Sequence, residues 1–150
     1  MKLETERLLI VPCTDALVPV LTEQEYNNGP QVWGHLKKLG EDPGILYWGP
    51  WLALLKSDGT IIGDLGFKGK PDDKGSVEIG YGLLEDYWNK GYATEAVGAL
   101  MEWAWQQDEV RKIKAETLVD NPGSIRVLEK LEMAVVTKSD EMIYWGKNKV

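Results

Sequence analysis

The chain has 150 residues, enough for one ordinary domain with a sizeable core and too few for two. Its net charge is −7, and residues 1–86 carry most of it, with 8 basic and 14 acidic residues. An acidic chain without clustered lysine and arginine is a poor candidate for nucleic-acid binding, whereas it suits a cationic partner. We expect one domain over residues 1–150, with acids that either attract a cation or serve only solubility.

The scarcity of metal-binding and nucleophilic side chains argues against several kinds of site. Cys13 is the only cysteine and His35 the only histidine, so a disulfide, a structural zinc site and a Ser-His-Asp triad are not expected. Cys13 is expected to be buried, and His35 to lie on the surface of a helix. The opening sequence carries early acids and no long apolar run, and no run elsewhere approaches membrane-spanning length, which predicts a cytoplasmic protein without a signal peptide.

Hydrophobic periodicity and turn residues predict the elements in chain order. They are a strand over 3–11, helices over 14–22 and about 28–39, a loop over 40–50, strands over 51–56, 61–67 and 76–84, a helix from about 93 to 104, a strand over 113–119, a helix from 121, and short strands near 135–136 and 142–145. Asp58-Gly59 is a hairpin signal, and Asn121-Pro122 is a typical helix start. A meander followed by strand–helix–strand–helix predicts an α/β or α+β layered domain, with a mixed, mostly antiparallel sheet flanked by helices.

The stretch from Glu85 to Ala96 brings together a strand end, a loop glycine and the start of a long helix. The first turn of a helix has free N–H groups and the positive end of the helix dipole, which favour an anion such as phosphate. Gly91 and Ala93 would let that anion approach the backbone closely. A plain strand-to-helix turn explains the same residues equally well. The nucleotide P-loop and Gly-x-Gly-x-x-Gly patterns are both absent.

Three segments in the same order resemble the GNAT superfamily of N-acetyltransferases. Residues 88–93 are similar to its pyrophosphate motif, Arg/Gln-x-x-Gly-x-Gly/Ala, and residues 92–96 resemble the RimJ/RimL-type branch of ribosomal-protein acetyltransferases. Residues 121–131 are similar to the family segment Asn-x-x-Ser-x-x-x-x-x-Lys-x-Gly, and residues 4–8 resemble the usual start of this branch. The resemblance covers nearly the whole chain and implies the GNAT acyl-CoA N-acyltransferase fold.

The resemblance also implies where the cosubstrate acetyl-coenzyme A binds. Backbone N–H groups would cradle its pyrophosphate at Asn89, Lys90, Gly91, Tyr92, Ala93 and Thr94. The pantetheine arm would lie between Gly82, Leu83 and Leu84 on one strand and residues 118–119 on the next. Asn121 and Ser124 would touch the arm or the phosphates, or would serve only as helix caps. No metal is implied.

Three residues depart from the family pattern. Trp88 stands where Arg or Gln usually begins the phosphate motif, and Leu128 stands where many members have a Tyr that protonates the departing thiolate. Glu132 replaces the usual Gly after the last helix, which makes a left-handed turn there unexpected.

Glu78 is the candidate catalytic base. In the strand 76–84, side chains alternate, so Glu78 shares a face with Gly80 and Gly82, and the glycines would leave room for a substrate. Some family members use a Glu on the matching strand as a base, often through water. A solvent-facing Glu on a half-exposed strand is the equal alternative.

These observations predict transfer of the acetyl group of acetyl-coenzyme A to a primary amine by direct attack in a ternary complex. The acceptor would be a protein N-terminus or a small-molecule amine, expected to be cationic, and the protein a monomer or homodimer that binds neither nucleic acid nor membrane. Tyr26, Trp33 and the aromatic residues within 47–51 would wall the acceptor site or belong to the core. A non-catalytic acyl-coenzyme A sensor or regulatory module is the alternative function.

Overall fold

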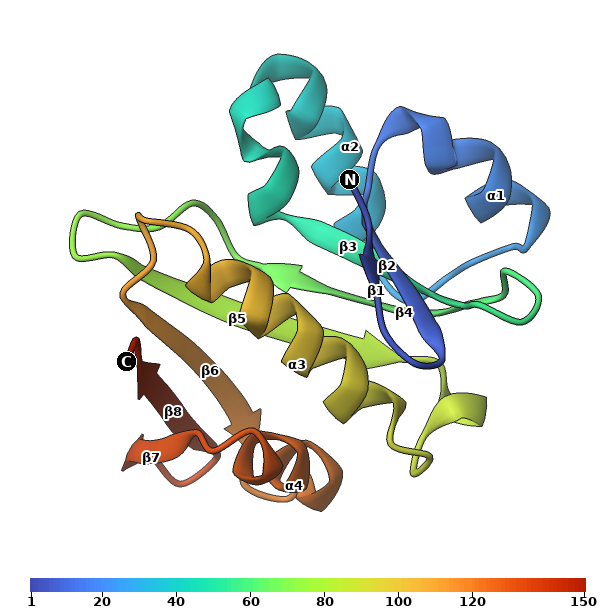
Figure 1. The fold of residues 1–150 in the computed structure, drawn as a ribbon. Coiled ribbons are helices and arrows are strands. Elements are labelled where there is room, and N and C mark those ends of the chain that lie inside the picture. The colour runs from blue at the N-terminus through green and yellow to red at the C-terminus, as the bar shows by residue number, and fades with distance from the viewer.

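A mixed sheet of eight strands runs through the computed structural model, which describes all residues 1–150 (Figure 1). The strands are β1 (Leu3–Glu4), β2 (Leu8–Pro12), β3 (Pro50–Leu55), β4 (Ile61–Phe67), β5 (Ser76–Leu83), β6 (Lys112–Leu118), β7 (Ala134–Lys138) and β8 (Met142–Asn148). Their order in the sheet is β1-β2-β3-β4-β5-β6-β8-β7, and only β5 and β6 pair in parallel. The predicted mixed, mostly antiparallel sheet is therefore confirmed.

Helices cover both faces of this sheet. The α-helices are α1 (Val18–Glu23), α2 (Gln31–Glu41), α3 (Tyr92–Trp105) and α4 (Pro122–Lys130), and the short 3₁₀ segments are η1 (Asp15–Leu17), η2 (Pro43–Trp48) and η3 (Glu85–Tyr87). Helix α3 lies across the sheet and α4 contacts it, while α1 and α2 lie together over the N-terminal strands (Figure 1). The larger core joins α3 and α4 to one face, and a smaller cluster joins α1 and α2 to the other.

Strands β5 and β6 are paired at one end only. Their register covers Ser76↔Lys112, Val77↔Ile113 and Glu78↔Lys114, and beyond these pairs the two strands diverge (Figure 1). The predicted alternation along β5 is also confirmed, because Val77 and Ile79 enter the core of α3. The sheet thus opens between β5 and β6 on the side where β5 leads to α3.

A β-bulge changes the alternation in β4. Ala53 pairs with Gly63 and Leu54 with Ile61, so Ile62 is an extra residue in β4. Ile62 packs in the core of α3, and strict alternation would send Asp64 to the same face. The bulge instead turns Asp64 toward the face covered by α1 and α2, where it contacts Tyr26.

Several local expectations change in the folded chain. The single strand predicted over 3–11 divides into β1 and β2, which pair with each other around a turn closed by the Thr5 N–H and the Leu8 carbonyl. Cys13 is buried as predicted, but His35 is also buried, so its predicted surface position is wrong. Glu132 adopts the left-handed turn that its side chain made unexpected, with φ +64°. No helix is both long and apolar enough to cross a membrane.

Candidate active site

The start of α3 presents a row of free backbone donors. Gly91 is the N-cap with φ +83°, and Asn89 has φ +60°, so the loop reverses sharply before the helix begins. None of the backbone N–H groups from Asn89 to Thr94 donates to another group of the protein. Such a row, at the positive end of a 14-residue helix, fits the oxygens of a pyrophosphate.

The N-terminal strand pair holds this loop in place through Arg7. The Arg7 guanidinium donates to the Lys90 carbonyl at 3.0 Å, pairs with the Glu95 carboxylate at 2.8 Å and lies 4.1 Å from the centre of the Tyr92 ring. Thr5 also donates to Glu95. Although burial opposes it, these hydrogen bonds lower the pKa of Glu95, and Glu95 in turn raises the pKa of Arg7. Because the Arg7 guanidinium donates a hydrogen bond to the Lys90 carbonyl, it fixes the orientation of the loop.

The opening between β5 and β6 offers backbone groups to an extended ligand. The Leu84 N–H and the Glu78 carbonyl bond to β4, so the alternate residues Tyr81 and Leu83 direct their N–H and C=O groups toward the opening. The Leu83 carbonyl accepts the Trp88 indole N–H at 2.8 Å. Trp88 therefore ties the loop to β5 through its indole N–H.

Across the opening, the start of α4 is capped as the sequence predicts. The Asn121 side chain accepts the Ser124 N–H at 3.1 Å, and the Ser124 carbonyl accepts the Tyr81 hydroxyl at 3.2 Å. Burial raises the pKa of Tyr81, so its hydroxyl stays protonated. Leu128 is fully buried in the core. Tyr81 therefore brings a phenol to this side of the opening, although position 128 offers none.

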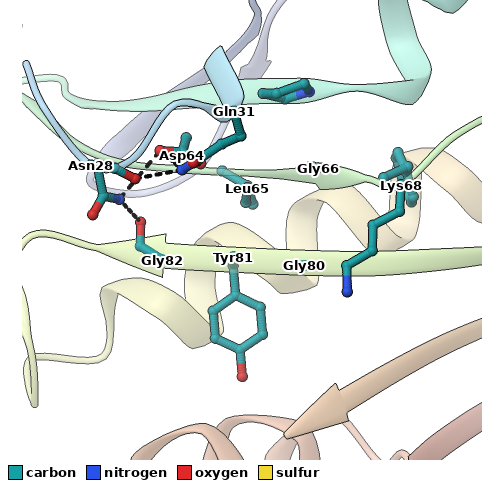
Figure 2. Close-up of a pocket in the computed structure, with 11 residues that line it drawn as sticks. Asn28, Gln31, Asp64, Leu65, Gly66, Lys68, Gly80, Tyr81 and Gly82 are labelled. Carbon is teal, nitrogen blue, oxygen red and sulfur yellow. Dashed lines mark hydrogen bonds between the residues drawn. The ribbon is translucent and has the colours of Figure 1, made fainter. Parts of the chain in front are cut away.

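A cavity of about 290 Å³ lies on the α1 and α2 face of the same strands. Its lining residues are Asn28, Gln31, Pro50, Asp64, Leu65, Gly66, Phe67, Lys68, Gly80, Tyr81 and Gly82. Gly80 and Gly82 on β5 pair with Gly66 and Asp64 on β4, and the missing side chains of the two β5 glycines leave the floor of the cavity low. In Figure 2, Asp64 lies at one end of the cavity and Lys68 at the other, while the Tyr81 side chain points to the opposite side of the sheet.

Asp64 is the only acid in this lining, and it is 5% exposed. Its Oδ2 accepts the Tyr26 hydroxyl at 2.5 Å and the Asn28 side-chain amide at 3.2 Å. Its Oδ1 accepts the Gln31 amide at 3.2 Å (Figure 2). Burial and the bond to Asp64 raise the pKa of Tyr26, which keeps that hydroxyl a donor.

Glu78 lies beyond the other end of the cavity in an ion-paired cluster. Its carboxylate is 2.6 Å from the Lys68 ammonium, which is also 3.5 Å from Glu116 on β6. Although partial burial opposes its charge, the bonds to Glu78 and Glu116 raise the pKa of Lys68. The cluster therefore holds one cation between two carboxylates, at the point where β5 and β6 begin to separate.

The structure brings most sequence-predicted residues to the two sides of β5. The loop from Asn89 to Thr94, the strand from Gly82 to Leu84 and the cap formed by Asn121 and Ser124 surround the opening, while Glu78 lies at its closed end. Of the predicted aromatic wall, Tyr26 reaches the cavity through Asp64, Trp33 is 46% exposed, and Trp48 and Trp51 belong to the core.

Asp64, Asn28 and Gln31 were not anticipated as site residues. The sequence carries one indication of Asp64, since it is a charged residue inside the otherwise apolar run from Ile61 to Phe67. Asn28 and Gln31 flank a turn and the start of a helix, where polar residues are ordinary. Only the packing of α2 over β4 brings them to the carboxylate.

Comparison with protein families matches residues 7–134 to the acetyltransferase (GNAT) domain. A curated relative, the uncharacterized N-acetyltransferase YjdG of Bacillus subtilis (strain 168), is 38% identical over 95 residues, which is 63% of this chain and 56% of the relative. The uncharacterized N-acetyltransferase p20 of Bacillus licheniformis is 33% identical over 78 residues, or 52% of this chain and 44% of the relative. The chain thus spans about half the length of the curated relatives it matches.

Solved structures share the fold over nearly the whole chain. The ribosomal-protein-S5-alanine acetyltransferase from Vibrio fischeri superposes with a TM-score of 0.80 at 16% identity, covering 99% of this chain and 97% of that one. The ribosomal L7/L12 α-N-protein acetyltransferase RimL, solved with coenzyme A, superposes with a TM-score of 0.77 at 17% identity, covering 99% and 98%. At these identities the likeness concerns the fold.

Proposed function

The chain belongs to the GNAT acetyltransferase family, and we propose that it transfers the acetyl group of acetyl-coenzyme A to a primary amine by direct attack in a ternary complex. The acceptor is the N-terminus of a protein or a small-molecule amine. The observation that carries this proposal is the row of free N–H groups from Asn89 to Thr94, next to the opening between β5 and β6. A ligand in which a pyrophosphate is joined to a long flexible arm requires an anion site that continues into an extended slot.

The cosubstrate supplies a thioester whose acetyl carbon is attacked and whose sulfur leaves as a thiolate. Residues 89–94 bind the pyrophosphate through their backbone, and the arm lies along Gly82, Leu83 and Leu84. The exposed side chains of Leu118 and Val119 supply the facing apolar wall. The Leu83 N–H faces the opening and donates to the carbonyl oxygen, where negative charge develops as the amine attacks. Holding the two substrates side by side contributes much of the rate.

Proton handling is assigned to Glu78 and Tyr81. A free alkylamine is mostly protonated at neutral pH and must lose a proton before its nitrogen can attack. Glu78, at the closed end of the opening, takes that proton through a water molecule. The Tyr81 hydroxyl, on the opposite face of β5, exchanges its bond to the Ser124 carbonyl for one to the departing sulfur. Tyr81 would then be the proton donor for the departing thiolate, in place of the tyrosine that is absent at position 128.

The acceptor is proposed to be cationic. Residues 1–86, which contribute the cavity, carry a net charge of −6. Asp64 belongs to the lining of the cavity, and Glu78 and Glu116 both pair with Lys68, the only lysine of that lining. An excess of negative charge attracts a cation and repels an anionic acceptor.

The test is a panel of cationic, neutral and anionic amines, with release of coenzyme A as the readout and binding of acetyl-coenzyme A measured in parallel. We expect turnover with cationic amines that declines as salt is raised, because at physiological ionic strength charges are screened beyond about 8 Å. Turnover confined to neutral or anionic amines would contradict the acceptor class. Binding without turnover on any amine would favour the sensor.

A further inference from the structure

Asp64 is a buried carboxylate without a counter-charge. It is 5% exposed, and no lysine, arginine or histidine forms an ion pair with it. Its three donors, Tyr26, Asn28 and Gln31, are all neutral. Buried acids are normally paired, because the loss of hydration on burial is large. Here the protein supplies hydrogen bonds to the Asp64 carboxylate but no positively charged side chain.

The two oxygens of this carboxylate are unequally used. Oδ2 accepts from Tyr26, from Asn28 and more weakly from Gln31 at 3.4 Å, whereas Oδ1 accepts only from Gln31. An ionised carboxylate has about four acceptor positions on its two oxygens, so Oδ1 can accept a further donor. Asp64 lines the cavity, and the adjacent glycines leave the approach to it open.

We propose that Asp64 is a subsite for a second cationic group of the acceptor, an ammonium or guanidinium distinct from the amine that is acetylated. The proposal rests on the proposed acetyl transfer and narrows the acceptor to amines that carry a further positive charge. That cation donates to Oδ1 and provides the counter-charge that the buried carboxylate lacks. A charge-assisted bond of this kind is stronger than a neutral one.

The attacking nitrogen lies elsewhere, for two reasons. An ammonium that donates to a carboxylate is stabilised in its charged form, so it has no lone pair for attack. Asp64 also pairs with Gly82 from the β4 side, whereas the opening lies at the other edge of β5, at least one strand spacing of about 4.8 Å away. An acceptor that spans this distance crosses the floor of Gly80 and Gly82, with one cation at Asp64 and the reacting amine near the opening.

The experiment compares diaminoalkanes with monoaminoalkanes of equal carbon number, in a series of increasing length, for binding to the purified protein by calorimetry. The wild type should bind at least one diamine about 10-fold more tightly than its matched monoamine, or about 1.4 kcal/mol. Asp64→Asn keeps the shape of the side chain and removes its charge, so it should abolish the preference. Asp140→Asn removes one negative charge from an exposed turn and should preserve it.

Loss of the fold in Asp64→Asn would not leave the proposal without a test, because the wild type is also examined by nuclear magnetic resonance. The side-chain amide signals of Asn28 and Gln31 should shift at about 10-fold lower concentrations of a diamine than of its matched monoamine. Equal binding of diamines and monoamines, or a diamine preference that survives in folded Asp64→Asn, would overturn the subsite.

Release of coenzyme A is measured separately from binding. Diamine binding through Asp64 without acetyl transfer would leave the subsite standing and contradict the proposed reaction. If the protein acetylates monoamines and diamines and binds both with equal affinity, the proposed reaction would stand and the subsite would be contradicted.

Discussion

Replacement of Gly91 by Val tests the assignment of the phosphate loop. Gly91 has φ +83°, and an added Cβ would approach only the Arg7 guanidinium, at 3.3 Å. The collision is with the end of a flexible side chain, so the main structural cost is the left-handed backbone, about 1–2 kcal/mol of folding free energy. The branched side chain would stand beside the free N–H groups and hold an anion beyond hydrogen-bonding distance. We therefore expect acetyl-coenzyme A to bind at least ~10-fold more weakly, a loss of about 1.4 kcal/mol.

Gly59→Val is the matched control. Gly59 also has a left-handed backbone, with φ +76° and open space around its missing side chain, but it lies in the turn between β3 and β4. Urea unfolding should report a similar loss of stability in both variants, whereas calorimetry with acetyl-coenzyme A should separate them. Unchanged affinity in folded Gly91→Val, or an equal loss of affinity in Gly59→Val, would refute the assignment of the loop.

Four further substitutions test individual residues. If Glu78 is the base, Glu78→Gln should lower kcat roughly 10²-fold with little change in the affinity for acetyl-coenzyme A. A variant that keeps the wild-type kcat across the pH profile would show that the Glu78 carboxylate has a structural role and is not the base. Tyr81→Phe should lower kcat about 10-fold or more, because a hydrogen bond to a charged group contributes roughly 1.5–3 kcal/mol; an unchanged kcat would exclude its bond to sulfur. Glu132→Gly should raise the free energy of unfolding in urea by about 1 kcal/mol or less, because the left-handed backbone at φ +64° costs a side chain about 1–2 kcal/mol and the extra chain entropy of glycine offsets part of that gain. A lowered free energy of unfolding would contradict the strain argument. Burial lowers the pKa of His35, so the unfolded chain binds a proton at this residue more readily than the folded chain. The free energy of unfolding should therefore be full above pH 6.5 and fall below it. An equal slope of the free energy of unfolding against pH in His35→Phe would show that His35 is not the cause.

Local patterns predicted the elements that surround the loop of residues 89–94, and its role in binding the cosubstrate stays a prediction. The glycine at position 91 and the helical apolar period after it fit an anion site and a plain turn equally well, and the family resemblance favoured the anion site. Alternation alone predicts which residues of β5 face the core. His35 was predictable in principle, because with Val32 and Leu36 it completes an apolar stripe at helical spacing. Its polarity outweighed that pattern in the prediction.

The acceptor side could not be derived in the same way. The direction of Asp64 depends on Ile62, the extra residue in β4, and a bulge of one residue has no mark in this sequence. Asn28 and Gln31 reach Asp64 only after α2 packs over the sheet, a contact between segments more than thirty residues apart. Glu132 shows the converse limit, since the turn after α4 is kept although its usual glycine is absent.

The contacts of Arg7 with Lys90 and Glu95 join the first residues of the chain to the loop before α3. The bonded residues are 83 and 88 positions apart in sequence, so these contacts close a long loop, and we expect them to form late in folding. We then expect the loop from Asn89 to Thr94 to be among the last parts of the molecule to become rigid. Removing the first seven residues would delete only β1 at the edge of the sheet, since β2 keeps its pairing with β3, yet it would remove the Arg7 donor from the Lys90 carbonyl and free the loop.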